Sequence, residues 1–150
     1  MNPIKTEYED SELTSKIIGC SMRVHTTLGC GFPELIYQRA LAKELAKSDI
    51  VFSREFEMPI FYDGETIGSR KVDFLIEKRV SVELKALTKL ENVHLAQAKN
   101  YLEAYDLRVG LLINFGAKSL ECKRLINSKA PPRPTKSIID SPSAESAKSV

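Results

Sequence analysis

The chain has 150 residues, of which 43% are hydrophobic and 28% charged, and its formal net charge is +2. This composition is typical of a globular protein with one domain and a sizeable core. A nearly neutral chain is not expected to coat nucleic acid by bulk charge, because non-specific affinity scales with the number of phosphates neutralised; a local basic groove stays open. The sequence contains nothing close to the roughly 18 consecutive apolar residues that a membrane-spanning helix needs, so no membrane span is expected.

The three cysteines, Cys20, Cys30 and Cys122, form no CxxC pair. The first ten residues carry several charges, so no signal peptide is expected. Reduced thiols in a cytoplasmic protein are the simplest interpretation. We expect these cysteines to be packing residues.

The chain begins with two predicted helices. Residues 1–10 are polar and are expected to form an N-terminal arm, after which apolar residues recur at helical spacing over 11–28. A glycine-rich corner leads to a second helix, with Pro33 predicted at its first position because proline lacks only an N–H that has no partner there. Glu34 then falls in the first turn, where the helix dipole favours a carboxylate by about 0.3–1 kcal/mol. Tyr37, three residues later, shares the face of Glu34.

Three strands are predicted next. Residues 50–62 form the first, and Pro59 indicates an edge or irregular position. Asp63-Gly64 is a hairpin signal. The second and third strands lie within 70–87 and are joined by a turn at 77–79.

The register of this second hairpin follows from burial. Apolar residues alternate on both strands, and only a three-residue turn or a bulge places both sets on one side. The predicted opposite pairs are Ile76 with Val80, Phe74 with Val82, and Val72 with Leu84.

The same register places Asp73 opposite Glu83, with Lys71 and Lys85 at the next step on that face. Like charges directly opposite one another destabilise a sheet by up to about 1 kcal/mol. A divalent cation held by both carboxylates would remove this cost. Spacing alone leaves a second interpretation open, in which these residues are solvated on the wet face of an antiparallel sheet.

A helix is predicted from Asn92, as its cap, to about Tyr105. His94, Gln97 and Tyr101 form a stripe beside its buried face. Residues 107–115 form a continuous apolar run typical of a buried strand, and 119–126 a last strand or edge. From 127 the chain is rich in proline and serine, and residues 127–150 are expected to be a disordered tail.

The element order predicts an α/β domain over residues 11–126, with a sheet that begins antiparallel and gains a strand after a crossover helix. Five segments in this order resemble the GxxExxY proteins, a branch of the PD-(D/E)xK nuclease superfamily. They are GFPELIY at 31–37, VDFLIE at 72–77, VELKA at 82–86, HLAQAKNYL at 94–102 and GLLINFG at 110–116.

The resemblance implies a restriction-endonuclease-like αβββαβ core, a mixed sheet flanked by helices, here with an extra N-terminal helix. In that pattern Asp73, Glu83 and the backbone carbonyl of Leu84 would hold Mg²⁺ or Mn²⁺, and Lys85 would orient or deprotonate the attacking water. Val72 stands where the superfamily's name has proline, which leaves the metal-binding aspartate in place.

The resemblance extends to the helices around the hairpin. Glu34 would add a further carboxylate, and Gln97 would position Lys85 or the water. The residues expected to face the substrate are Tyr37, Tyr101, Lys71 and His94.

The implied function is metal-dependent hydrolysis of phosphodiester bonds in DNA or RNA. Nearby basic residues are candidates for backbone contacts, with solvated surface as the alternative: Arg70, Lys71, Lys78, Arg79, Lys89 and Lys99. A second hypothesis is a nuclease-fold module that binds nucleic acid or protein without turnover. The sequence also leaves open a homodimer and a protein partner for the tail, for which Pro131-Pro132-Arg133-Pro134 is the candidate segment.

Overall fold

The structure is a computed structural model that describes residues 10–130. Of the expected N-terminal arm at 1–10, residues 1–9 lie outside the described residues, and so does 131–150 of the expected tail at 127–150, with its candidate docking motif. Residues 127–130 are described, and Asn127 and Ala130 are buried.

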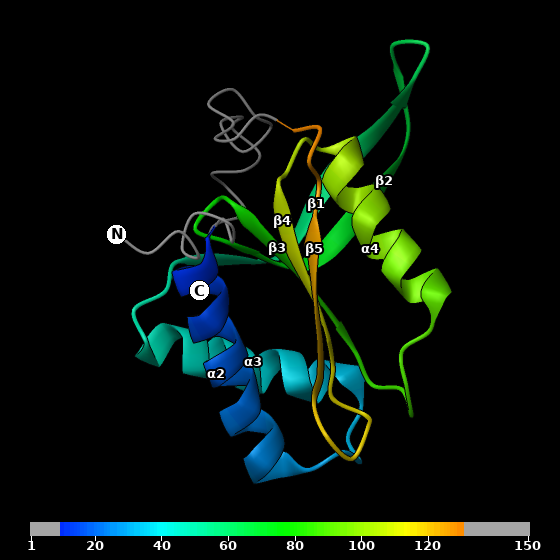
Figure 1. The fold of residues 1–150 in the computed structure, drawn as a ribbon. Helices are drawn as coiled ribbons and strands as arrows, with labels where there is room; N and C mark the ends of the chain where they lie inside the picture. The colour runs from blue at the N-terminus through cyan, green and yellow to red at the C-terminus, as the bar shows by residue number, and fades with distance from the viewer. Residues whose placement is uncertain (1–9, 131–150) are drawn as a thin grey trace.

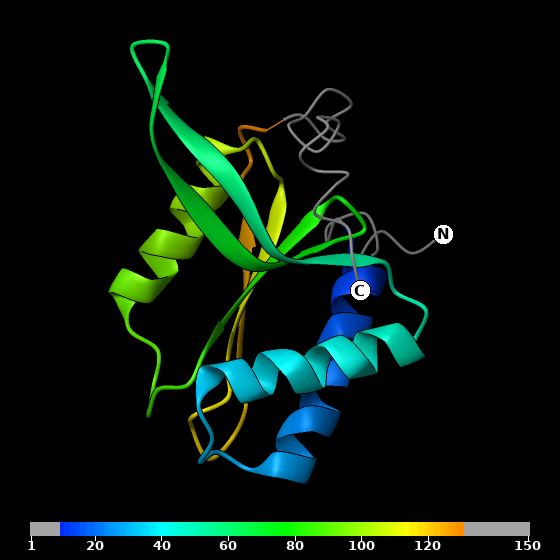
Figure 2. The ribbon, with the colours of Figure 1, turned by 180° about the vertical axis from the view of Figure 1, so that it is seen from behind.

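A mixed five-stranded sheet with helices on both faces forms the domain (Figures 1 and 2). The strands are ordered β1-β2-β3-β4-β5; β3 and β4 are parallel, and the other neighbours are antiparallel. The elements are α2 (Ser11–Leu28), α3 (Glu34–Lys47), β1 (Phe52–Tyr62), β2 (Glu65–Ile76), β3 (Val80–Lys85), α4 (Asn92–Ala104), β4 (Val109–Asn114) and β5 (Glu121–Ile126). The predicted α/β class and its αβββαβ core with an extra N-terminal helix are confirmed.

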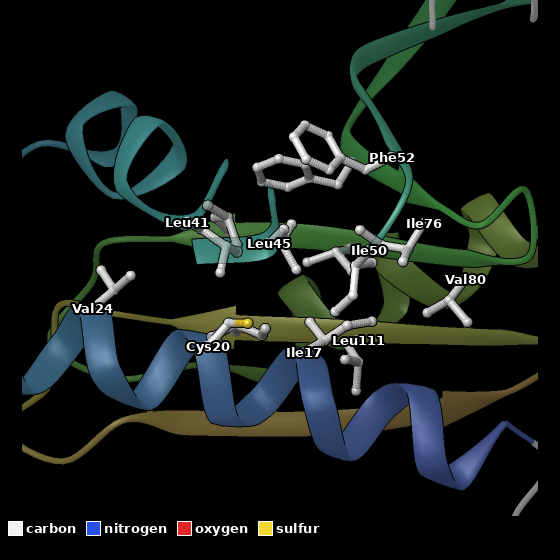
Figure 3. Close-up of a cluster of buried hydrophobic side chains, with 14 of the residues drawn as sticks. Ile17, Cys20, Val24, Leu41, Leu45, Ile50, Phe52, Ile76, Val80 and Leu111 are labelled. Atoms are coloured by element: carbon white, nitrogen blue, oxygen red, sulfur yellow. The ribbon is translucent and has the colours of Figure 1, made fainter. Parts of the chain in front are cut away.

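Each face of the sheet has its own hydrophobic core. The first core packs α2 and α3 against β3 and β4, and Figure 3 shows Ile17 and Cys20 of α2 close to Leu111 of β4. The second core packs Tyr101 and Leu102 of α4 against the sheet from the other side. Within 10–130, no helix is long and apolar enough to cross a membrane.

The β2–β3 hairpin has the predicted three-residue turn. Ile76 pairs with Val80 and Phe74 with Val82. The turn bends sharply because Glu77 and Lys78 both have left-handed backbones, with φ of 53° and 59°. Burial of alternate side chains therefore did select the register.

The third predicted pair, Val72 with Leu84, is wrong. Leu84 belongs to the first core, whereas Val72 packs in the second core with Phe56. Phe74, only two residues from Val72, is in the first core, so the alternation of faces along β2 is interrupted at Asp73. The prediction of this pair required an uninterrupted pleat along β2, and the pleat is interrupted at Asp73.

Two helix starts differ from the prediction by one position. Pro33 is the N-cap of α3 rather than its first residue. Glu91, and not Asn92, is the N-cap of α4. The Glu91 side chain accepts a hydrogen bond from the backbone N–H of His94, and the His94 ring accepts one from the backbone N–H of Glu91. This reciprocal capping box satisfies two N–H donors at once.

The β1–β2 hairpin extends well beyond the other strands as an arm (Figures 1 and 2). Asp63 and Gly64 at its tip have φ of 53° and 77°, as the Asp-Gly signal predicts for a tight hairpin turn. β1 is an edge strand of the sheet, which accounts for the tolerance of Pro59.

Candidate functional site

The candidate site lies where β2 and β3 separate. Their ladder ends at the pair Phe74–Val82, and Asp73 is the next residue of β2. Among the described pairs of β1 with β2, the register passes from Arg54–Phe74 to Phe56–Val72, leaving Glu55 and Asp73 without a ladder partner. Glu55 has a left-handed φ of 48°, which marks the same irregularity on the neighbouring strand. The irregularity coincides with the change of face described above.

The carboxylate of Asp73 fills the opening between the two strands. Its Oδ2 accepts a hydrogen bond from the backbone N–H of Leu84 at 2.8 Å, and its Oδ1 accepts one from Nε2 of Gln38 on α3, also at 2.8 Å. In a strand, the N–H and C=O of one residue leave on the same edge. The carbonyl of Leu84 is therefore directed toward the opening that holds Asp73.

Glu83 and Lys85 flank Leu84 on β3 and point toward α4. Leu84 is buried in the first core, and strand alternation sends its neighbours to the opposite face. There they line a cleft of about 470 Å³ between the sheet and α4. The other residues of the cleft are Arg70, Val93, Ala96, Gln97 and Asn100.

Three carboxyl groups that interact with Lys85 have raised pKa values: Glu83 in the cleft, and Asp73 and Glu34 outside its lining. Burial raises the pKa of Asp73, although the hydrogen bonds from Leu84 and Gln38 oppose it. Burial and then the charge of Asp73 raise the pKa of Glu83. The same two causes raise the pKa of Glu34, an exposed residue whose carboxyl group still loses part of its hydration. Lys85 acts on all three in the opposite direction by lowering each pKa, so its ammonium is their common counter-charge.

Comparison with protein-family models shows which superfamily the chain resembles. A family model described as the PD-(D/E)XK nuclease superfamily matches residues 11–125. The chain belongs to the PD-(D/E)XK nuclease superfamily. Neither the curated proteins nor the solved structures gave a match.

The residues expected to bind metal carry oxygen atoms, which are the ligands that hard divalent cations prefer. Mg²⁺ is typically held by one or two carboxylates while it keeps several waters, and backbone carbonyls are further oxygen donors for such hard cations. Asp73, Glu83 and the Leu84 carbonyl, the ligands expected from the sequence, would make up such a donor set. Within 10–130, however, no group of three His, Cys, Asp or Glu side chains is arranged to hold a metal ion by itself.

The segment after Lys85 is braced against β4. The Lys85 carbonyl accepts the N–H of Phe115 at 2.8 Å. The buried Asn114 side chain accepts the N–H of Leu87 at 2.8 Å and donates to its carbonyl at 2.9 Å. Gly116 allows this close approach, because a Cβ there would lie 2.4 Å from the backbone N of Leu87. These contacts fix the end of β3 that carries Lys85.

Gln97 lines the cleft, but the four residues expected at the substrate do not. Tyr37 is fully buried; its hydroxyl donates to the Gly29 carbonyl at 2.5 Å, and its ring stacks on Phe115 at 4.7 Å. The other three are placed as follows: Tyr101 is 1% exposed in the second core, His94 caps α4, and Lys71 is exposed opposite Glu57.

Two further residues contribute to the site: Arg70, predicted only as one of several candidates for backbone contacts, and Gln38, for which no role was predicted. Arg70 of β2 donates to Asn100 Oδ1 at 2.6 Å and to the Gln97 carbonyl at 2.5 Å, and it lies over the ring of Tyr101. The sequence signal for Arg70 was only its place among the basic residues near the hairpin. Gln38 lies one turn after Glu34 on the same face of α3, and that spacing was its only signal.

Proposed function

We propose that this protein is a divalent-metal-dependent nuclease that hydrolyses phosphodiester bonds of DNA or RNA. The supporting observation is the convergence of Asp73, the Leu84 backbone and the Glu83–Lys85 pair where β2 leaves β3. The superfamily match supports nuclease-like function in general. The GxxExxY motif at 31–37 further supports assignment to that branch.

The charges of the site favour a bound cation. The charge of Asp73 raises the pKa of both Glu83 and Glu34, and Lys85 lowers the pKa of all three carboxyl groups. One ammonium shared by three carboxyl groups leaves the negative charge incompletely balanced. We propose that Asp73, Glu83 and the Leu84 carbonyl hold Mg²⁺ or Mn²⁺. When bound, the ion would polarise the phosphate and lower the pKa of a coordinated water.

The remaining residues bind and orient the substrate. Lys85 would orient or deprotonate the attacking water and offset the charge that develops on the phosphate. Gln97, across the cleft on α4, would hold the same water or the Lys85 ammonium. Arg70 would contact a neighbouring phosphate, since its guanidinium is held rigidly at the rim of the cleft by α4. Glu34 would add a carboxylate from the start of α3.

The test is cleavage of labelled single- and double-stranded DNA and RNA with Mg²⁺, with Mn²⁺ or with chelator. The proposal expects metal-dependent cleavage that is lost in Lys85→Met and Asp73→Asn. The matched controls are Lys16→Met, at an exposed position of α2, and Asp63→Asn, at the tip of the β1–β2 hairpin. Both should cleave like the parent. Equal cleavage by Lys85→Met and the parent would indicate a contaminating nuclease and contradict the proposal.

One observation favours a second candidate, a nuclease-fold module that binds nucleic acid without turnover. The described residues 10–130 hold no preformed group of three acidic, His or Cys metal ligands. Calorimetry with Mg²⁺ and an oligonucleotide separates the two candidates. Tight binding without products on prolonged incubation supports the module, and turnover excludes it.

A further inference from the structure

The carboxylate of Asp73 is held by a partly buried chain of side chains that begins on β1. Arg54 donates from Nε and Nη2 to Oε1 of Gln38, at 3.3 Å and 3.1 Å. Gln38 in turn donates from Nε2 to Oδ1 of Asp73 at 2.8 Å. The chain connects β1, α3 and β2 at the point where β2 loses its ladder partners.

The direction of the Gln38 amide is dictated by its neighbours. A guanidinium only donates hydrogen bonds, and an ionised carboxylate only accepts them. Oε1 must therefore face Arg54 and Nε2 must face Asp73; the flipped amide would place like groups together at both ends. Gln38 is 3% exposed, so water cannot readily take over either bond.

This arrangement holds Asp73 without neutralising it. A direct Arg–carboxylate pair would be strong and often bidentate, and it would occupy the oxygens a cation needs. Here Arg54 contacts the amide, and Asp73 receives a neutral donor. Each Asp73 oxygen accepts one hydrogen bond, one from Gln38 and one from Leu84. A carboxylate has roughly four lone-pair sites, so acceptor capacity remains on both oxygens.

We infer that Gln38, fixed by Arg54, is the positioning residue for Asp73: it sets the rotation of the carboxylate and leaves its charge for a cation. The inference rests on the proposed function for the identity of that cation. Glu34 lies one turn before Gln38 on α3, so the same contact also fixes the approach of Glu34 to the site. Partners that orient a metal ligand in this way typically account for about 10–100-fold in metal affinity.

The experiment compares Gln38→Leu, Arg54→Met and Arg54→Lys, with Arg39→Met at the exposed neighbouring position of α3 as the control. The first readout needs no metal. In chelator, amide hydrogen exchange of Leu84 reports its bond to Asp73, and we expect faster exchange in Gln38→Leu and Arg54→Met. Arg54→Lys keeps a donor for Oε1 and should exchange like the parent, as should Arg39→Met.

The second readout is calorimetric titration with Mn²⁺. We expect Gln38→Leu and Arg54→Met to bind about 10-fold or more weakly, with Arg54→Lys close to the parent. The double variant Gln38→Leu, Arg54→Met should bind Mn²⁺ no more weakly than Gln38→Leu alone, because Arg54 acts through Gln38. A general packing defect would instead weaken the double variant further.

The results separate this inference from the proposed function. If Mn²⁺ binding by the parent does not depend on Asp73, the proposed function fails, and Leu84 exchange still decides the role of Gln38. Unchanged Leu84 exchange in a folded Gln38→Leu would overturn the inference. Should Gln38→Leu not fold, equal exchange in Arg54→Met and Arg54→Lys would overturn it in the same way.

Discussion

The backbone N–H of Leu84 lies 2.8 Å from Oδ2 of Asp73, across the opening where β2 and β3 part. A side chain here replaces the ladder bond that a continuing strand would have made. The replacement places a carboxylate beside the Leu84 carbonyl and next to the cleft that Glu83 and Lys85 line. The opening in the sheet is therefore what creates the candidate site.

Replacing Glu83 by Gln should stabilise the metal-free protein while weakening metal binding. Burial and the charge of Asp73 both raise the pKa of Glu83, so its ionised form is disfavoured in the folded state. Removing that charge should raise the free energy of unfolding in chelator, because the folded protein no longer has to hold a buried carboxylate beside Asp73. Urea unfolding in chelator and in Mg²⁺ measures both effects. A metal-free Glu83→Gln protein that is less stable than the parent would contradict the charge argument.

Stability without metal should rise as the pH falls toward the pKa values of the unfolded carboxyl groups. The pKa values of Asp73, Glu83 and Glu34 are raised in the folded state, mainly by burial, so the folded state binds more protons than the unfolded chain. Stability then decreases as the pH rises from the unfolded-state values, about 4, through the folded-state pKa values. With Mg²⁺ the trend should reverse, because the ion competes with protons for the carboxylates.

Urea midpoints at several pH values, in chelator and in Mg²⁺, measure this effect. The double variant Asp73→Asn, Glu83→Gln is the matched control and should show a flatter dependence in chelator. An equal slope in parent and control would assign the effect to other groups.

Replacing Tyr37 by Phe should reduce stability and leave catalysis intact. The hydroxyl of Tyr37 donates to Gly29 and accepts the N–H of Phe32, at 2.5 Å and 3.1 Å. Losing both bonds should cost about 1–3 kcal/mol. Chemical denaturation and kcat/KM at a temperature where both proteins are folded give the two quantities. A large loss of kcat/KM in the folded variant would restore Tyr37 to the substrate contacts.

Replacing Gly116 by Ala should displace the segment that follows Lys85. Its Cβ would lie 2.4–2.5 Å from backbone atoms of Ala86 and Leu87, which cannot move independently of β3. We expect destabilisation of about 3 kcal/mol and loss of cleavage. Gly68→Ala is the control, because a Cβ there meets nothing within 4 Å. Thermal unfolding and the cleavage assay compare the two, and a harmless Gly116→Ala would show that the segment is free to shift.

Alternating apolar residues were enough to predict the turn length and the register of the β2–β3 hairpin. They did not predict the partner of Val72, because the pattern does not show where the pleat is interrupted. The interruption involves two neighbouring strands, at Asp73 of β2 and Glu55 of β1, where the chain changes faces. It is a tertiary property and leaves no mark in the spacing of either strand.

The predicted site residues divide in the same way. Asp73, Glu83 and Lys85 belong to one local hairpin, but the predicted pair of Asp73 with Glu83 is absent, because the β2–β3 ladder ends at Phe74–Val82. Asp73 instead accepts the N–H of Leu84. Gln97 and Tyr101 lie four residues apart on α4, so helical spacing predicted the same surroundings for both. In the structure Gln97 lines the cleft, whereas Tyr101 is buried in the second core. Gln38 was missed because a single glutamine on a helix has no pattern until its two partners are placed around it.

Anomalous diffraction from a crystal containing Mn²⁺ would show whether the opening between β2 and β3 binds a metal ion. We predict a peak within coordination distance of an Asp73 oxygen, a Glu83 oxygen and the Leu84 carbonyl, at about 2.0–2.6 Å, and its disappearance in Asp73→Asn. A parent crystal with Mn²⁺ bound elsewhere, or with no peak in this opening at saturating Mn²⁺, would contradict the claim that the parting strands form a metal site.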